Sequence, residues 1–171
     1  ETRMAITCNE STVAAEPFGV NAKRQRLLTD ARVKGTRILL DRLTLGAGAV
    51  IELAVPAGSL VWFQMLGGAA TLRGKGRDEQ LTPSYIVFLP PAFCGMLICP
   101  ASAVLLYAEV PNAADHDADF ATRPPQFRIV DWTREPVLAS EHDARKRIYV
   151  VTPKLFGTRA LKGEMIIYPP G

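Results

Sequence analysis

The sequence predicts an all-β domain in which short strands form a barrel or a sandwich. Between residues 27 and 110, short apolar runs alternate with Gly, Pro, Asp and Thr. Several runs alternate apolar and polar side chains with a period of two, and none keeps the helical period of about 3.6 residues over three turns. Regularly spaced short strands favour a barrel or a sandwich, because these architectures protect the edges of a sheet.

The expected strands follow one another from residue 38 onward. Apolar runs of strand length cover Ile38–Leu45, Val50–Val55, Leu60–Leu66, Ala70–Arg73, Ile86–Leu89, Met96–Cys99 and Val104–Val110. Gly67-Gly68, Gly74-Lys75-Gly76 and Pro90-Pro91 supply turns between them. We therefore expect a barrel over 27–110, with residues 1–26 as an N-terminal arm.

The composition is typical of a water-soluble globular protein. Hydrophobic residues make up 48% of the 171-residue chain and charged residues 22%, which allows one domain and part of another. The net charge of +3 is spread over separate turns without interleaved aromatic residues, so no nucleic-acid partner is expected. No apolar run approaches the roughly 18 residues of a membrane span, so no membrane partner is expected either. The three cysteines match neither a zinc site nor a disulfide framework, which favours reduced thiols in the cytoplasm.

Residues 111–145 read as a linker that is rich in Pro, Ala and Asp. It contains the sequence Asp115-His116-Asp117 and runs into Pro124-Pro125. Two carboxylates and an imidazole could in principle hold a divalent ion, but nothing in the pattern organises them around one centre. We interpret this cluster as a hydrated acidic loop.

The end of the chain repeats its beginning at a constant offset of 123 residues. Lys23-Arg24 returns as Lys146-Arg147, residues 27–29 as 150–152, residues 38–45 as 161–168, and Gly48 as Gly171. The apolar pattern agrees across the same window, which predicts a duplicated domain. We therefore expect residues 146–171 to form the first strands of a second repeat.

Two segments of the expected barrel resemble the conserved motifs of the cupin superfamily. Residues 48–68 have the spacing of cupin motif one, in which a glycine precedes a His-x-His pair, a glutamate and a second glycine. On this spacing the two histidine positions are Ala54 and Pro56, and the glutamate position is Val61. Residues 83–95 resemble cupin motif two and place Gly95 at the third histidine position. The resemblance implies an RmlC-like jelly-roll barrel, the double-stranded β-helix of cupins.

A typical cupin binds manganese, iron, nickel or zinc through three imidazoles and one carboxylate inside this barrel. Ala54, Pro56, Val61 and Gly95 carry no donor side chain, and the chain contains only two histidines. We therefore expect no metal, no cofactor and no catalytic residue in the barrel formed by 27–110.

Two interpretations remain for the residues around the vacated metal positions. In the first, Val61, Phe63 and Met65 fill the barrel with apolar volume, because they alternate along one strand. In the second, Trp62 or Phe63, with Met65, Phe93 and Cys94, lines a metal-free pocket for a small apolar or carboxylate ligand. Cys94 could be a nucleophile, but no histidine lies near it in the sequence, so we interpret it as a buried and inert thiol.

Repeat and linker together resemble a bicupin, in which two barrels follow each other in one chain. The resemblance implies a second barrel with a divalent metal (manganese, iron, nickel or zinc), and the offset places its histidine pair at positions 177 and 179. It also implies dioxygenase, isomerase, lyase or aminohydrolase chemistry on a small molecule, in a layout similar to that of ureidoglycine aminohydrolases. The alternative is a non-catalytic module for ligand binding or assembly. Because two apolar strands cannot enclose a core, we expect the tail to pack on the barrel of its own or a partner chain, and the protein to form a homodimer or larger homo-oligomer.

Overall fold

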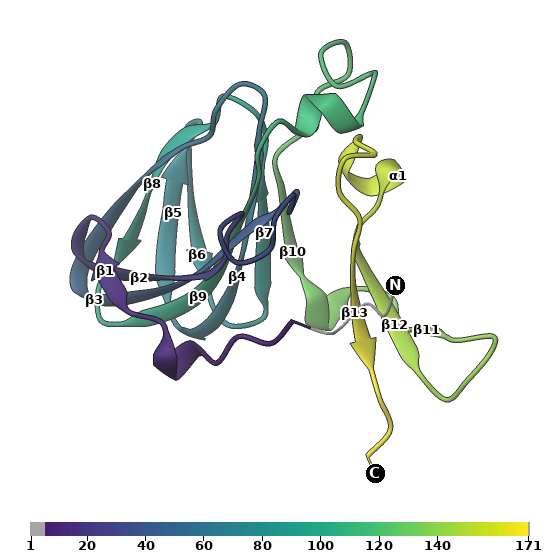
Figure 1. Cartoon of the computed structure of the whole chain (residues 1–171), viewed down its shortest axis with the longest axis horizontal. Coiled ribbons are helices and arrows are strands. Elements are labelled where there is room, and N and C mark those ends of the chain that lie inside the picture. Colours follow the sequence, from purple (N-terminus) through teal and green to yellow (C-terminus); the bar gives the residue numbers. More distant parts are fainter. Residues whose placement is uncertain (1–5, 171) are drawn as a thin grey trace.

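The computed structural model describes residues 6–170, and it is an all-β jelly roll with a smaller β module beside it (Figure 1). Most of the strands form one curled antiparallel sheet, in the order β10-β7-β4-β9-β3-β8-β5-β6. Strand β2 also pairs with β3, and β1 pairs with β2. Their bounds are β1 (Ala15–Pro17), β2 (Val20–Leu28), β3 (Leu39–Ala54), β4 (Leu60–Gly68), β5 (Ala70–Gly74), β6 (Arg77–Leu81), β7 (Tyr85–Leu89), β8 (Cys94–Cys99), β9 (Ala103–Val110) and β10 (Arg128–Asp131).

The long strand β3 lets the sheet curl. Its first half pairs with β2 and β9, and its second half, from Ala49 to Ala54, pairs with β8. Between the two halves, Gly48 takes a positive φ of 71°, which costs a glycine little. One continuous strand therefore pairs with β2 and β9 along its first half and with β8 along its second half.

The barrel is filled with apolar side chains. Val61, Phe63 and Met65 are between 0 and 2% exposed and pack with residues from β3, β7, β8 and β9 in one core cluster. Their alternation with Trp62 and Gln64 along β4 follows the period of a strand. The structure thus confirms that these three side chains occupy the barrel interior.

The smaller module is a three-stranded sheet near the C-terminus. It contains β11 (Leu138–Ala139), β12 (Lys146–Val151) and β13 (Gly163–Ile167), with the one-turn helix α1 (Pro153–Phe156) between the last two. Its apolar side chains form a second core cluster with the outer face of β4, β7, β9 and β10. Phe156 packs on Phe88 of β7, with ring centroids 5.1 Å apart. The predicted packing of the tail on the barrel is therefore found within the same chain.

The sheet of the barrel extends beyond the predicted limits of 27–110. Strand β1 and most of β2 lie within the predicted arm 1–26, whose first five residues are outside the described part of the chain. Strand β10 lies within the predicted linker 111–145 and pairs with β7 from Arg128 to Asp131. Both segments lack a long apolar run because only alternate residues face the core, and the short strands β1 and β10 give a weak sequence pattern.

In the acidic sequence of the linker, Asp115 is exposed, as expected of a hydrated loop, but Asp117 is not. Asp117 is only 7% exposed, and its carboxylate accepts hydrogen bonds from the hydroxyl of Thr158 at 2.7 Å and from the backbone N–H of Arg159 at 2.9 Å. These bonds join the linker to the loop after α1. They also lower the pKa of Asp117, the Thr158 hydrogen bond being the main cause.

Candidate functional site

The structure corrects two of the four predicted metal-ligand positions. Ala54 and Pro56 are exposed on the outside of the barrel, whereas Leu53 and Val55 are 3% and 5% exposed and belong to the barrel core. The register explains the difference, because Leu53 pairs with Gly95 and therefore shares its face, while Ala54 pairs with Cys94. Motif spacing alone had placed the pair one residue too late, and a shift of one residue exchanges the two faces of a strand.

The other two positions, Val61 and Gly95, do face the barrel interior. Val61 is 2% exposed, and a Cβ atom added to Gly95 would lie 2.8 Å from the ring of Phe93 and 2.5 Å from the carbonyl oxygen of Arg73. The ring of Phe93 thus takes up the space beside Gly95 in which a side chain at this position would project.

The interior positions do not fit the metal of a typical cupin. Leu53, Val55, Val61 and Gly95 have no nitrogen, oxygen or sulfur in their side chains, so none can be a ligand. Within residues 6–170, no three His, Cys, Asp or Glu side chains lie close enough together to hold a metal ion. Any chemistry of this barrel therefore depends on other side chains.

The predicted ligand pocket is not assembled as a unit. Phe63 and Met65 are buried in the core, and Cys94 is exposed on the outer face, so our interpretation of Cys94 as a buried thiol is wrong. The error follows from the same strand alternation, because Cys94 pairs with the outward-facing Ala54. Of the predicted pocket residues, Phe93 and Trp62 line described pockets, but these are two different pockets.

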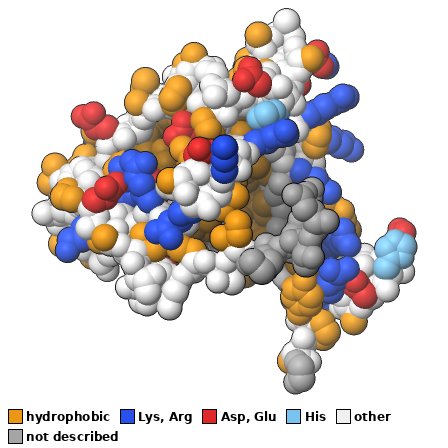
Figure 2. Space-filling model, viewed as in Figure 1, with side chains coloured by type: hydrophobic (Ala, Val, Ile, Leu, Met, Phe, Trp, Pro, Cys, Tyr) orange, Lys and Arg blue, Asp and Glu red, His pale blue; other side chains and the backbone are white. Residues whose placement is uncertain are grey.

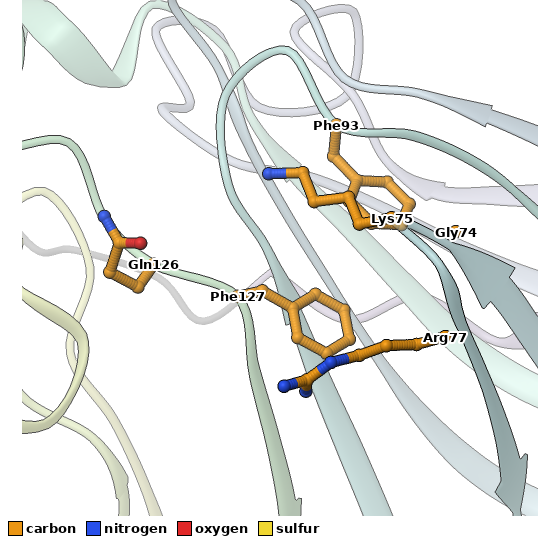
Figure 3. A pocket seen from close by; sticks show the side chains of 6 residues that line it. All are labelled: Gly74, Lys75, Arg77, Phe93, Gln126 and Phe127. Carbon is orange, nitrogen blue, oxygen red and sulfur yellow. The ribbon is translucent and has the colours of Figure 1, made fainter.

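That pocket has a volume of about 270 Å³ and lies beside the turn between β5 and β6. Its lining residues are Gly74, Lys75, Arg77, Phe93, Gln126 and Phe127. The rings of Phe93 and Phe127 are nearly parallel, with centroids 5.8 Å apart. Lys75 Nζ lies 5.9 Å from the centroid of Phe93, and the guanidinium carbon of Arg77 lies 5.9 Å from that of Phe127. Figure 3 shows both cationic ends on the side of the rings that faces Gln126.

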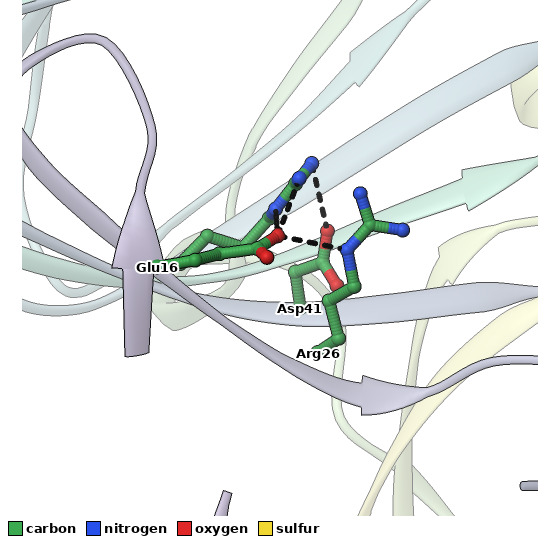
Figure 4. Close-up of polar contacts among 4 residues, drawn as sticks. Glu16, Arg26 and Asp41 are labelled. Carbon is green, nitrogen blue, oxygen red and sulfur yellow. Dashed lines mark hydrogen bonds and ion pairs between the residues drawn. The ribbon is translucent and has the colours of Figure 1, made fainter. Parts of the chain in front are cut away.

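A second group of polar side chains joins β1 and β2 to β3 (Figure 4). Glu16 accepts hydrogen bonds from the guanidinium groups of Arg24 at 2.6 Å and Arg26 at 2.9 Å, and Arg24 lies 4.0 Å from Asp41. The hydrogen bond from Arg26, followed by that from Arg24, lowers the pKa of Glu16. Partial burial raises the pKa of Asp41.

Tyr107 of β9 adds a partly buried phenol beside this polar group. It pairs with Asp41 on β3, and its ring lies 6.5 Å from that of Phe63 in the barrel core. Burial, and then the negative charge of Glu109, raise the pKa of Tyr107 well above its ordinary value. A pocket of about 190 Å³ lies here, lined by Phe18, Arg24, Arg26, Thr29, Leu39, Asp41, Tyr107 and Glu109.

Sequence reasoning missed this polar group, although a signal was present. Asp41 stands at an apolar position of the alternating run that contains Leu39, Leu43 and Leu45, so its inward direction could have been inferred. Charges in the group are closely balanced, with two arginines facing Glu16, Asp41 and Glu109. We interpret its main effect as the fixing of β1 and β2 on the barrel.

The barrel resembles solved structures, whereas sequence comparisons find nothing. No family model matches the chain, and no curated protein matches it. Protein Ylba from E. coli matches 84% of this chain at 10% identity with a TM-score of 0.68, and a putative glyoxylate induced protein from Pseudomonas aeruginosa matches 83% at 11% identity with the same score. These matches cover 56% and 54% of those two proteins, so the chain spans about half of their length. An RmlC-like cupin from Shewanella frigidimarina matches 61% of this chain and 89% of its own at 19% identity, with a TM-score of 0.50.

The described part of the chain holds no helix long and apolar enough to cross a membrane.

Proposed function

We propose that this chain, which has the cupin fold, is the metal-free first half of a two-barrel cupin whose complete form is a metal-dependent enzyme acting on a small molecule. In this proposal the first barrel is structural, and the second barrel holds the metal and the catalytic residues. The observation that carries the proposal is a repeat in the pairing of strands.

Strands β12 and β13 pair in the same register as β2 and β3. Lys23 pairs with Thr44 and Arg24 with Leu43, and at an offset of 123 residues Lys146 pairs with Ile167 and Arg147 with Ile166.

The irregularities of the two pairs also correspond. The register of β2 and β3 shifts between Arg26 and Leu28, and that of β12 and β13 shifts between Tyr149 and Val151, at the same offset. A short strand, β1 or β11, precedes and pairs with each first strand. The counterpart of Gly48, Gly171, lies outside the described residues. Shared register and a shared irregularity support descent of the module from a duplicated barrel start.

The free edge of β13 also fits a barrel that continues. Strand β3 pairs with β2, β8 and β9, whereas β13 pairs only with β12 among the described strands. The side chains of Ile166 and Ile167 are each 40% exposed, and Tyr168 is 65% exposed. Hydrophobic side chains are visible on the segment that leads to the C-terminus (Figure 2). Further strands of a second barrel would cover both the edge and these side chains.

The catalytic class follows from the proposed metal in the second barrel. The interior positions Leu53 and Val55 of the first barrel correspond to positions 176 and 178 of the continued chain, one residue earlier than the motif spacing alone suggests. Histidines at such positions would support dioxygenase, isomerase, lyase or aminohydrolase chemistry. The two-barrel layout is similar to that of ureidoglycine aminohydrolases, so ammonia release from ureidoglycine is the first activity to assay.

The experiment is to express the complete reading frame of the gene and to measure its metal content and ammonia release. The proposal predicts a second barrel, about one equivalent of metal per chain, and loss of both metal and activity when the inward histidine pair is replaced by alanine. Lys162→Ala is the matched control, because it removes a surface cation without touching either barrel interior. A reading frame without a second barrel would overturn the proposal.

The alternative is an assembly module in which a second copy of the chain covers β13. The exposed apolar edge of β13 favours this alternative, because the edges of two chains can pair about a two-fold axis. Light scattering on residues 1–171 separates the two: a dimer that Ile167→Lys converts to a monomer supports self-assembly, and a monomer excludes it.

A further inference from the structure

We propose that the pocket beside the β5–β6 turn binds a small carboxylate with a flat apolar body. This site lies in the first barrel, and the inference does not depend on whether a second barrel exists. It rests on three observations. Two cationic side chains extend into the same pocket, neither has a close carboxylate partner, and the backbone of Lys75 has a positive φ.

The first observation is that cationic and apolar groups converge on one concave site. Lys75 lies in the turn and Arg77 follows it, and both side chains extend past the paired rings of Phe93 and Phe127, toward the amide of Gln126 (Figure 3). The amide nitrogen of Gln126 donates to the carbonyl of Pro124 at 3.0 Å, which fixes the side chain at the rim. Apolar walls with a few convergent polar groups are typical of small-molecule sites.

The second observation is that neither cation is neutralised by a close carboxylate. Among the described residues Lys75 forms no ion pair, and the closest carboxylate oxygen to Arg77 is that of Glu79 at 4.0 Å. Arg73 on the same hairpin differs, because its guanidinium donates to both carboxylate oxygens of Asp78, at 2.9 and 2.8 Å. Two positive charges are therefore available to one anion, and an arginine can hold a carboxylate with two hydrogen bonds.

The third observation is that Lys75 stands at a position that lysine does not favour. The two residues between β5 and β6 are Lys75 and Gly76, with φ values of 50° and 72°. Positive φ at both residues is the pattern of a type I′ turn, in which Asn-Gly and Gly-Gly are preferred. A lysine with positive φ is strained relative to asparagine or glycine, so its presence indicates a role other than folding.

The size and shape of the pocket narrow the class of ligand. A volume of about 270 Å³ is at the small end of ligand sites, so a single ring with one carboxylate fits better than a nucleotide. The exposed part of the Phe127 ring and the aliphatic stem of Lys75 offer contact to a flat apolar body, while the two cations bind the carboxylate.

The test is titration of the 171-residue chain with benzoate, followed by the amide NMR signals of Gly74, Lys75 and Gly76. We expect saturable binding on the order of 1 mM, weaker binding of the neutral analogue benzamide, and a loss of affinity at high salt. Lys75→Asn should weaken benzoate binding about tenfold because one of two cations is lost. The same variant should raise the melting temperature by about 2 °C, because asparagine suits the turn.

Controls separate this site from a general effect of charge. Lys34→Asn removes an exposed lysine from another loop and should change neither benzoate affinity nor the signals of the turn. Arg77→Gln should weaken benzoate binding like Lys75→Asn, which keeps the test valid if one variant misfolds. The proposal is overturned if benzoate does not shift the turn signals, if benzamide binds as well as benzoate, or if Lys75→Asn and Arg77→Gln bind like Lys34→Asn.

Discussion

Phe156 is the side chain that best reports how the C-terminal module is held on the barrel. It is 2% exposed and packs on Phe88 of β7, with ring centroids 5.1 Å apart and planes tilted by 51°. Truncation of a buried phenylalanine removes its apolar area and leaves a cavity, at a typical cost of 3 to about 5 kcal/mol. We therefore expect Phe156→Ala to lower the free energy of unfolding by about 4 kcal/mol.

The neighbouring residue is a matched control. Leu155 belongs to the same short helix but is 41% exposed, so Leu155→Ala should cost less than about 1 kcal/mol. Urea denaturation should be followed by far-UV circular dichroism and by tryptophan fluorescence, since Trp62 and Trp132 both pack against the cluster that contains Phe156. Phe88→Ala combined with Phe156→Ala should give a coupling energy of about 1 kcal/mol or more.

The reasoning is refuted if Phe156→Ala and Leu155→Ala cost the same and neither moves the fluorescence transition. That result would mean that the module is not packed on β7 in solution. An early fluorescence transition in Phe156→Ala alone would instead agree with the account, because the module would then detach before the barrel unfolds.

Further variants test the linker and Gly95. Asp117→Asn should lower the free energy of unfolding by about 1–2 kcal/mol at pH 7, because a charged acceptor of three hydrogen bonds becomes neutral. Since these bonds depress the pKa of Asp117, its contribution is present above the unfolded pKa of about 3.9 and is lost as the pH falls through the folded value. The difference between wild type and variant should therefore shrink below about pH 4, and a difference that grows there would contradict this assignment. Gly95→Ala should cost about 1–3 kcal/mol, because its Cβ would meet Arg73 O and Phe93, whereas Gly58→Ala has open space and should be neutral. Gly95→His should likewise destabilise the barrel without creating metal binding, as measured by calorimetric titration with zinc; stoichiometric binding would be the contrary result.

The strand content of the barrel was predictable because buried strands leave a period of two in the sequence. The runs around β3, β4 and β9 contain enough alternating apolar residues for their core faces to be recognised. Strands β1, β10 and β11 are two to four residues long, and such short segments carry no detectable period.

The site was less predictable because it depends on the face that each residue takes. Motif spacing selected Ala54 and Pro56, but the pairing of Leu53 with Gly95 shows that the inward positions lie one residue earlier. Cys94 was misplaced for the same reason. The pocket of Lys75 and Phe127 joins residues about 50 positions apart in the sequence, and they meet because Phe127, which directly precedes β10, packs beside Phe93 and Arg77 in the folded chain.

The metal content of the 171-residue chain tests the central claim most directly, namely that the barrel has an apolar interior that binds no metal. The protein should be purified without chelator, dialysed against metal-free buffer and analysed for manganese, iron, nickel and zinc. The account predicts far less than one equivalent of any of them, because the side chains at Leu53, Val55, Val61 and Gly95 have no donor atom. One tightly held equivalent per chain would contradict it.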